Sequence, residues 1–327
     1  MRIAVTGSIA TDHLMVFPGR FADQLLPDQL AHVSLSFLVD RLEVRRGGVA
    51  ANIAFGLGGL GLAPLLVGAV GTDFAEYEVW LKEHGVDTGG VHVSAEHQTA
   101  RFLCITDEDT NQIAAFYAGA MAEAYDIDLT TLVTATGRPG LVLISPDDPA
   151  AMLRHTAECR TLGIPFAADP SQQLARLDGD QVRDLVDGAT WLFTNEYEAA
   201  LLKERTGWSR SDILATVGTW VTTLGEKGVR IESVGRPALD VPAIPDAETV
   251  DPTGVGDAFR AGFLAAVAHG IPLEPAARLG CALASVALGA VGSQSYEVDP
   301  AQLSGIIERT YGSGTAEPLA SLLGERS

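Results

Sequence analysis

The sequence predicts an α/β protein whose core is a mostly parallel β-sheet covered by helices, with a small second sheet beside it. Apolar runs of strand length alternate with helical stretches along most of the 327 residues, and this alternation is typical of parallel sheets. Two zones, 13–46 and 96–120, contain short strand-like segments that do not fit the alternation. We expect these zones to form the small sheet, and residues 1–12, 47–95 and 121–327 to form the core.

The expected elements of the core follow one another in a regular order. Strands are expected at 2–6, 65–71, 141–145, 166–169, 191–195 and 220–225. Helices are expected at 49–61, 77–84, 152–162, 182–186, 197–205 and 258–270.

The small sheet is expected from both zones. In the first zone, Val33, Leu35 and Phe37 alternate with Ser34 and Ser36, and a period of two indicates a half-exposed strand. In the second zone, the runs RFLCIT and QIAAFY flank the acidic turn DEDTN, which predicts two more strands. Strands in so small a sheet leave unpaired edges, so a homodimer through this sheet is a reasonable expectation.

The composition excludes some classes of partner. The chain has 22 basic and 42 acidic residues and a formal net charge of −20. Nucleic acid and anionic membrane surfaces are therefore poor partners, because both require a basic surface. The cysteines, Cys104, Cys159 and Cys281, are far apart, which favours reduced thiols. No stretch has the layout of a signal peptide or a membrane span, so we expect a soluble, cytoplasmic protein.

The segment DPTGVGDAFRAGF, residues 251–263, leads from a glycine-rich turn into a helical stretch. Gly254, Val255 and Gly256 are expected at the helix N-terminus, where unpaired N–H groups and the helix dipole favour an anion. Asp257 falls in the first turn. It either caps the helix or accepts a proton from a hydroxyl that attacks a bound phosphoryl group, and spacing alone leaves both interpretations open. The glycine motifs of P-loop and dinucleotide-binding proteins are absent.

This segment closely resembles the D-T-x-G-x-G-D motif of the ribokinase-like (PfkB) sugar and nucleoside kinases. Further motifs match in the family's order: Gly7 with Asp12, Gly47 and Gly48 with Asn52, Asn195 with Glu198, and TLGEKG at Thr223 to Gly228. Two departures are small, because Ser8 replaces a frequent acid or asparagine and Pro252 replaces a frequent threonine. The resemblance implies a three-layer α/β/α fold with a β-sheet lid.

The resemblance also implies ATP-dependent phosphorylation of a sugar CH2OH group. Asp257 would be the general base, and the N–H groups of Gly254, Val255 and Gly256 would form the anion hole. The residues that would bind ATP are Asn195, Thr223, Leu224, Gly225, Glu226, Lys227, Gly228 and Gly256.

The family further implies two cations. Glu198 would help to organise Mg²⁺ and the phosphates, whereas Asp251 and Thr253 would hold a monovalent cation such as K⁺. Without the resemblance, Asp251 is equally well a turn-capping acid, and Asn195 with Glu198 is a helix cap with a first-turn acid.

The choice of substrate depends on the lid, where the chain resembles bacterial adenosine kinases. This resemblance implies that Phe102 and Phe116 stack on adenine and that Gln172 and Gln173 lie near its edge. The residues that would hold the rest of the nucleoside are Ser8, Asp12, Ser36, Gly48 and Asn52. The implied reaction converts adenosine and ATP into AMP and ADP.

Other readings of the same residues remain open. Phe102 and Phe116 could simply be the core of the lid, and the substrate could be a free sugar, as in a ribokinase or fructokinase. Arg45 and Arg46 keep a sugar-phosphate kinase open, since a second phosphate needs basic residues. A non-catalytic nucleotide sensor on this fold is disfavoured, because a sensor has no need of the base Asp257.

Overall fold

The computed structural model describes residues 1–25, 32 and 34–324, and its core is a nine-stranded sheet. The strand order is β13-β12-β11-β10-β9-β8-β1-β4-β5, and all pairs are parallel except those that involve β12. The strands are β1 Ile3–Thr6, β4 Leu65–Val70, β5 Asp87–Val93, β8 Leu141–Ile144, β9 Phe166–Ala168, β10 Trp191–Asn195, β11 Thr219–Thr223, β12 Val229–Glu232 and β13 Leu239–Val241. The predicted mostly parallel sheet is confirmed.

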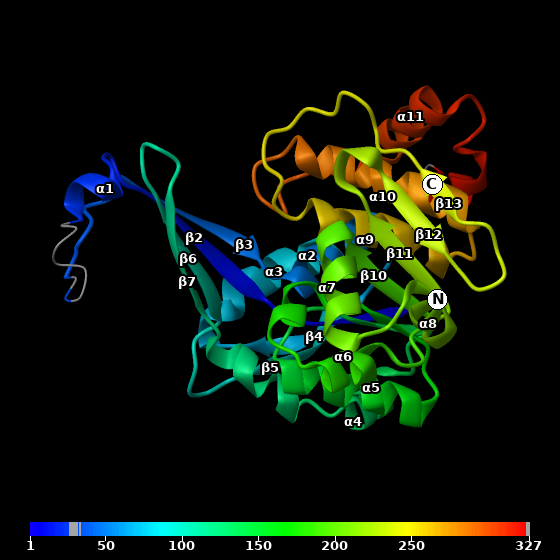
Figure 1. The fold of residues 1–327 in the computed structure, drawn as a ribbon, viewed down its shortest axis with the longest axis horizontal. Helices are drawn as coiled ribbons and strands as arrows, with labels where there is room; N and C mark the ends of the chain where they lie inside the picture. The colour runs from blue at the N-terminus through cyan, green and yellow to red at the C-terminus, as the bar shows by residue number, and fades with distance from the viewer. Residues whose placement is uncertain (26–31, 33, 325–327) are drawn as a thin grey trace.

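Helices cover both faces of this sheet (Figure 1). One face carries α2 Val49–Gly59, α3 Ala75–Glu83, α9 Val255–Ala268, α10 Leu273–Leu288, α11 Pro300–Tyr311 and α12 Ala320–Leu323. The other carries α4 Leu129–Thr136, α5 Pro149–Leu162, α6 Gly179–Val186, α7 Glu196–Thr206 and α8 Arg210–Thr216. Successive residues of β1 illustrate why there are two cores: Ile3 and Val5 pack into the first and Ala4 into the second. The three-layer architecture predicted from the sequence is confirmed.

Short 3₁₀ helices join several of these elements. They are η2 Thr72–Phe74, η3 Gly119–Asp126, η4 Ser171–Ala175, η5 Gly225–Lys227 and η6 Glu317–Leu319. In the part of the chain that is described, no helix has both the length and the hydropathy needed to cross a bilayer.

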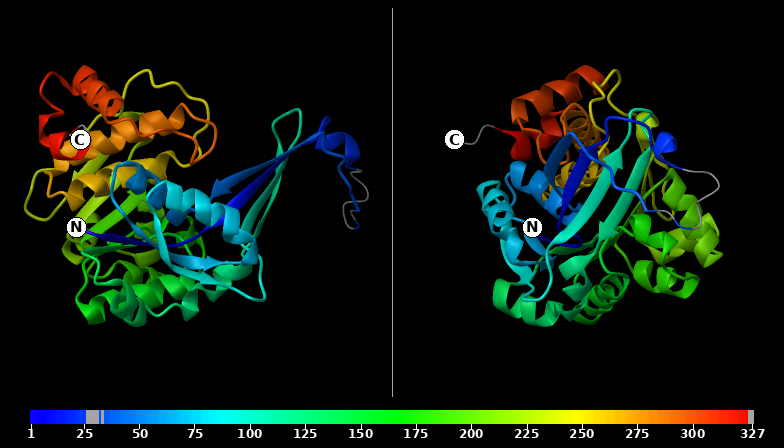
Figure 2. Two further views of the ribbon diagram at one scale, coloured as in Figure 1. Left: turned by 180° about the vertical axis from the view of Figure 1, so that it is seen from behind. Right: turned by 90° about the vertical axis from the view of Figure 1, so that its left-hand side faces the viewer.

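A four-stranded sheet projects from the core as a lid (Figures 1 and 2). Its order is β3-β2-β6-β7, with β2 Ala10–Val16, β3 Arg41–Gly47, β6 Ala100–Thr106 and β7 Gln112–Tyr117. The register places Arg45, Asp12, Phe102 and Phe116 directly opposite one another across the four strands. Residues opposite one another share a face of a sheet, so these four side chains form one row.

The strand predicted around residues 33–37 is wrong. Residues 34–39 form no strand, and Val33 lies outside the described residues. Phe37 instead packs against Phe17 and Phe21, with ring centroids 5.0 Å apart in both pairs, beside α1 Phe21–Gln24 at the far end of the lid. The alternation therefore reflects one anchored aromatic ring in an otherwise exposed segment.

Candidate active site

The N-terminus of α9 has the geometry of an anion-binding site. Gly254 is the N-cap residue with φ +78°, and a Cβ there would lie 2.5 Å from Ser293 Cβ, so only glycine fits. The N–H of Val255 makes a long bond of 3.4 Å to Pro252 O. Among the described residues, the N–H groups of Gly254, Gly256 and Asp257 have no acceptor and no side chain caps the helix. These amides are available to an anionic ligand.

Asp257 lies in the first turn of α9, beside these amides. Its Oδ2 accepts a hydrogen bond of 2.8 Å from Nδ2 of Asn52 in α2. Burial raises the pKa of Asp257 from 3.8 to about 7, although the Arg260 guanidinium and the Asn52 bond oppose this effect. A carboxyl group with a pKa near neutrality is suited to general base catalysis at neutral pH.

Asn52 is itself held by residues that the sequence analysis did not single out. Ser293 Oγ and Gln294 Nε2 both donate to Asn52 Oδ1 at 2.9 Å. Gln294 Nε2 also bonds Tyr77 OH, which donates to Gly47 O at 2.9 Å. No short motif marks Ser293, Gln294 or Tyr77, because they meet only through the fold. This network orients the Asn52 amide so that its N–H points at Asp257.

The two glycines before α2 are needed for close approach. A Cβ on Gly47 would lie 2.8 Å from Asp12 Oδ2, and one on Gly48, which has φ +93°, would lie 2.5 Å from Ser8 O. Ser8 is buried, and its Oγ accepts a bond of 3.1 Å from Val49 N at the start of α2. The predicted residues Ser8, Asp12, Gly48 and Asn52 are thus brought together.

The lid row faces this site. Burial raises the pKa of Asp12 to about 6, while Arg45 opposes the rise. Arg45 Nη1 lies 3.1 Å from Asp251 Oδ2 in the loop before α9, which connects the row to the core. Phe102 is half-buried, and Phe116 is 52% exposed. The strand register places both rings on the face of the lid that carries Asp12. The exposure of Phe116 makes its ring accessible to a ligand.

Asp251 has its charge satisfied within the chain. Its Oδ1 accepts from Thr253 N at 2.9 Å, and its Oδ2 accepts from Gly292 N at 2.9 Å and from Arg45 Nη1 at 3.1 Å. A monovalent cation at this carboxylate would meet the Arg45 guanidinium. In this arrangement Asp251 and Thr253 do not fit the implied K⁺ site.

Asn195 and Glu198 form the capping box of α7. Asn195 Oδ1 accepts from Glu198 N at 2.8 Å, and Glu198 Oε2 accepts from Asn195 N at 2.7 Å. The second carboxylate oxygen of Glu198 accepts a weaker bond of 3.3 Å from Ser171. The described residues contain no cluster of three or more His, Cys, Asp or Glu that could hold a metal. One carboxylate oxygen of Glu198 thus has only this weak partner, which would fit the implied contact to a water of Mg²⁺.

The predicted ATP-binding turn lies at the end of β11, next to Asn195. Asn195 and Thr223 are directly opposite one another in the β10–β11 ladder. The turn from Leu224 to Gly228 contains η5, and Leu224 N donates to Gly228 O at 2.7 Å. Lys227 Nζ lies 3.6 Å from a carboxylate oxygen of Glu196. The carboxyl ends of β10 and β11 thus meet at one edge of the sheet, where ligands commonly bind in α/β folds.

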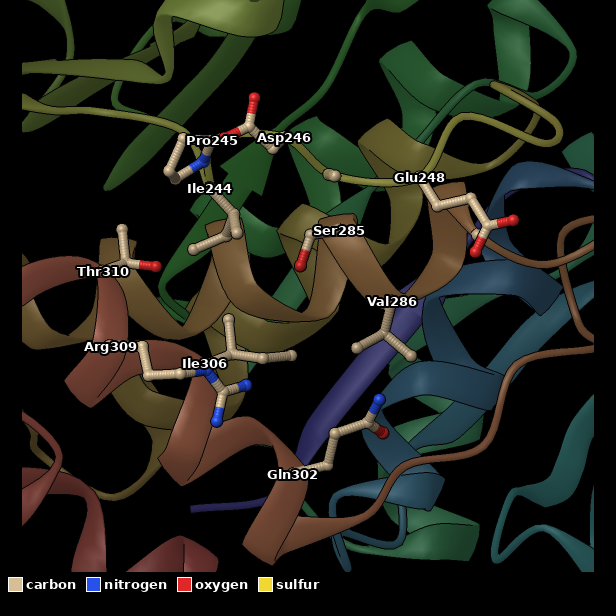
Figure 3. A pocket seen from close by; sticks show the side chains of 12 residues that line it. Ile244, Pro245, Asp246, Glu248, Ser285, Val286, Gln302, Ile306, Arg309 and Thr310 are labelled. Atoms are coloured by element: carbon tan, nitrogen blue, oxygen red, sulfur yellow. The ribbon is translucent and has the colours of Figure 1, made fainter.

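A cavity of about 510 Å³ lies between the loop after β13 and the helices α10 and α11. Figure 3 shows its walls, which are the loop 244–248, Ser285 and Val286 of α10, and Ile306 and Arg309 of α11. No sequence motif indicates this cavity, because its walls come from separate segments of the chain.

The remaining residues predicted to bind the nucleoside differ in their burial and in their distance from the site. Gln173 in η4 is buried, and its Nε2 donates to Asp147 O at 2.7 Å, whereas the neighbouring Gln172 is exposed. Ser36 is exposed in the segment 34–39 at the far end of the lid and is not brought together with the other residues. Its role as a nucleoside contact stays a prediction that would require the lid to move.

Comparisons with known proteins agree with this geometry. Residues 8–299 match the pfkB family carbohydrate kinases. The nucleoside kinase of Methanothermobacter thermautotrophicus is 32% identical over 271 residues, or 82% of this chain and 86% of that protein. The nucleoside kinase of Methanocaldococcus jannaschii is 30% identical over 251 residues, or 76% and 81%. The structure of Burkholderia thailandensis nucleoside kinase in complex with inosine has a TM-score of 0.82 and 32% identity, and covers 94% of this chain and 98% of that chain.

The matched span contains the α9 anion site, Asp257, the lid row and the turn after β11. The family suggested by the five sequence motifs is therefore confirmed. The chain is a member of the pfkB carbohydrate kinase family, with a ribokinase-like fold and nucleoside kinases among its relatives.

Proposed function

We propose that the protein transfers the γ-phosphoryl group of ATP to the 5′-hydroxyl of adenosine, giving AMP and ADP. The observation that carries this proposal is Asp257, a carboxyl group with a pKa of about 7 beside three unpaired amides. At neutral pH a substantial fraction of Asp257 is ionised and accepts the hydroxyl proton. The N–H groups of Gly254 and Gly256 stabilise the negative charge on the group being transferred.

A nucleoside is favoured over a free sugar by the lid row. Asp12 is a carboxylate that accepts hydrogen bonds from ribose hydroxyls. It lies against Gly47, and the N–H of Asn52 donates to the oxygen of the next residue, Gly48. Phe102 and Phe116 continue the row with two aromatic rings, of which Phe116 is exposed. Aromatic rings next to a diol-binding acid suit a base attached to ribose. We place Gln172 and Gln173 at the purine edge, where Gln173 would offer its Oε1 because its Nε2 already donates to Asp147 O.

For the donor, we propose that the phosphates of ATP lie between the α9 amides and the turn Thr223 to Gly228, and that its purine enters the 510 Å³ cavity. A Cβ on Gly228 would lie 2.1 Å from Val241 O, so this turn packs directly against the chain that leads into the cavity loop. Val286→Trp should fill the cavity and raise KM for ATP while leaving KM for the nucleoside near its original value. Equal changes in both KM values would contradict this placement.

Mg²⁺, when bound with ATP, supplies positive charge that offsets the charge developing on the transferred oxygens. Glu198 would hold a water of its hydration shell, while its other oxygen remains in the α7 capping box. Glu198→Gln keeps the capping geometry but removes the charge, so it should raise the Mg²⁺ concentration needed for half-maximal rate.

We also propose a homodimer through the lid. The face of the lid opposite the lid row carries exposed apolar side chains: Leu42 and Val44 are each 58% exposed, Ile113 46% and Tyr117 43%. Within the described part of the chain, the outer strands β3 and β7 each have one edge without a partner strand. A second copy that packs its lid on this face would cover apolar side chains and strand edges together.

The proposed reaction is tested with a substrate panel. Purified protein with MgATP is assayed against adenosine, inosine, cytidine, ribose, fructose and fructose 6-phosphate, and products are identified by ³¹P NMR. We expect the highest kcat/KM with adenosine and a product phosphorylated at the 5′ position. A preference for ribose or fructose would favour the alternative sugar kinase, and nucleotide binding without turnover of any acceptor would indicate a sensor.

A further inference from the structure

A buried ion pair lies directly behind the candidate base. Arg260, one helical turn after Asp257, is 8% exposed, and Asp169 at the end of β9 is fully buried. Arg260 Nη2 donates to Asp169 Oδ1 at 2.7 Å, and Arg260 Nε lies 2.6 Å from Asp169 Oδ2. The remaining nitrogen, Nη1, donates to Gly256 O at 3.0 Å. The guanidinium thus holds β9 and the first turn of α9 together.

Arg260 is close enough to influence Asp257 but does not bind it. Among the described residues, no ion pair or hydrogen bond joins the two side chains, although each affects the other's charge. A guanidinium bound directly to Asp257 would stabilise the carboxylate so strongly that it could not accept a proton. Asp169 prevents this contact, because it accepts a hydrogen bond from Nη2 and lies in ion-pair contact with Nε of the same guanidinium.

The charges around Asp257 explain why a cation is needed there. Asp169 faces it from β9, Glu198 from α7, and Tyr296 from the segment after α10, while Asn52 of α2 is neutral. Arg260 is the only cationic group among these neighbours. Without Arg260, burial and two nearby carboxylates would all favour the protonated form of Asp257, which is inactive as a base.

We propose that Arg260, anchored by Asp169, is a positioning residue that keeps the base Asp257 ionised while being held out of contact with it. This inference rests on the proposed function, since it assigns Asp257 the role of base. It concerns only residues of this chain and requires no additional ligand.

Replacing either member of the pair should shift the titration midpoint of Asp257, in opposite directions for Arg260 and Asp169. Arg260→Gln removes the cation, so the midpoint for titration of Asp257 should rise by about one pH unit or more. Asp169→Asn leaves the cation unopposed and free to turn, so the midpoint should fall and kcat should fall with it. Arg260→Lys preserves the charge and should stay near the wild type. A purely structural role would not move the midpoint in opposite directions.

The test measures the titration of Asp257 directly and then its effect on catalysis. Protein labelled with ¹³C at the aspartate carboxyls is titrated by NMR, and the Asp257 signal is identified by its absence in Asp257→Asn. The acid limb of kcat/KM against pH is then measured for each variant and should follow the NMR midpoint. Arg230→Gln is the matched control, because it breaks an exposed Arg–Asp pair between β12 and β13 and should change neither curve.

Arg260→Gln leaves Asp169 buried without its partner, so this variant could fail to fold. The double variant Asp169→Asn/Arg260→Gln removes both charges and should show a smaller rise in the midpoint. Unchanged midpoints in Asp169→Asn and in the double variant would overturn the inference. If the midpoints move as expected but the wild type phosphorylates no acceptor, the proposed function fails and the electrostatic role of the pair stands.

Discussion

Replacing the candidate base should stabilise the protein while it slows phosphoryl transfer. In Asp257→Asn, an amide of the same shape can still accept the hydrogen bond from Asn52. Folding raises the pKa of Asp257 from 3.8 to about 7, and each pH unit corresponds to about 1.4 kcal/mol. This sets an upper limit of about 4 kcal/mol. Because the residue is only half-buried, water weakens the effect, and we expect the free energy of unfolding to rise by ~2 kcal/mol.

The pH dependence of this stability gain shows whether the ionisation of Asp257 causes it. Below pH 4, Asp257 is protonated in both the folded and the unfolded protein, so it has no effect on the difference between the variants. From pH 4 to about 7 only the unfolded chain releases the proton, and the wild type loses stability. Above about pH 7 both the folded and the unfolded protein have released this proton, so the stability that the wild type has lost stays constant. The gain in Asp257→Asn should therefore grow between pH 4 and pH 7 and then level off.

The assay is urea unfolding of wild type and Asp257→Asn at pH 5 and pH 8, followed by circular dichroism. Asp240→Asn serves as control, because Asp240 pairs with Arg230 on the surface, so this variant should gain nothing at pH 8. In parallel, kcat of Asp257→Asn should fall by about 10²–10⁴-fold with ATP binding retained. A variant that is less stable at pH 8, or whose gain is equal at both pH values, would refute the reasoning.

Three other predictions test the lid and its contact with the core. Phe102→Ala should weaken adenosine binding by about 1–3 kcal/mol in a calorimetric titration, with thermal stability retained; a loss of stability alone would make the ring part of the lid core. Val44→Glu places a charge on the outer lid face and should shift sedimentation from dimer to monomer, whereas a monomeric wild type would contradict the proposed dimer. Because Arg45 neutralises Asp251, wild-type rates should be equal in KCl and choline chloride, and Arg45→Met should become sensitive to K⁺; strong activation of the wild type by K⁺ would contradict this.

The sequence was sufficient for the core because its signals there are local. Strands such as β4 and β8 are continuous apolar runs. The helix that carries Asp257 follows a motif in which only glycine fits at Gly254, because φ is +78° there and a side chain would collide with Ser293. The strands β5, β12 and β13 were not predicted. β5 contains Gly89 and Gly90, and β13 is only three residues long, so their stability comes from neighbouring strands and not from their own pattern.

The lid was harder to predict because its strands, too, depend on neighbouring strands and not on their own sequence pattern. β3, with the sequence RLEVRRG, is mostly exposed, and its strand conformation depends on pairing with β2. The serine and leucine alternation nearby looked more regular but has no partner strand. Three residues of the site were not predicted: Ser293, Gln294 and Tyr77. Each contacts Asn52 or Gly47 and not the expected ligand, and residues that act indirectly in this way have no characteristic spacing in the sequence.

The absence of lysine from the DPTGVGDAF turn has a physical reason in this arrangement. A flexible surface lysine would be hydrated and screened, and in contact with Asp257 it would remove the basicity that the reaction requires. The positive potential comes instead from the amides of α9 and from Arg260, which is fixed by Asp169 behind the site. Both sources are rigid and partly or wholly excluded from water, so they act strongly on a nearby anion. A chain with a net charge of −20 can therefore present a local site for phosphate, because what matters is the placement of a few fixed dipoles and one buried cation.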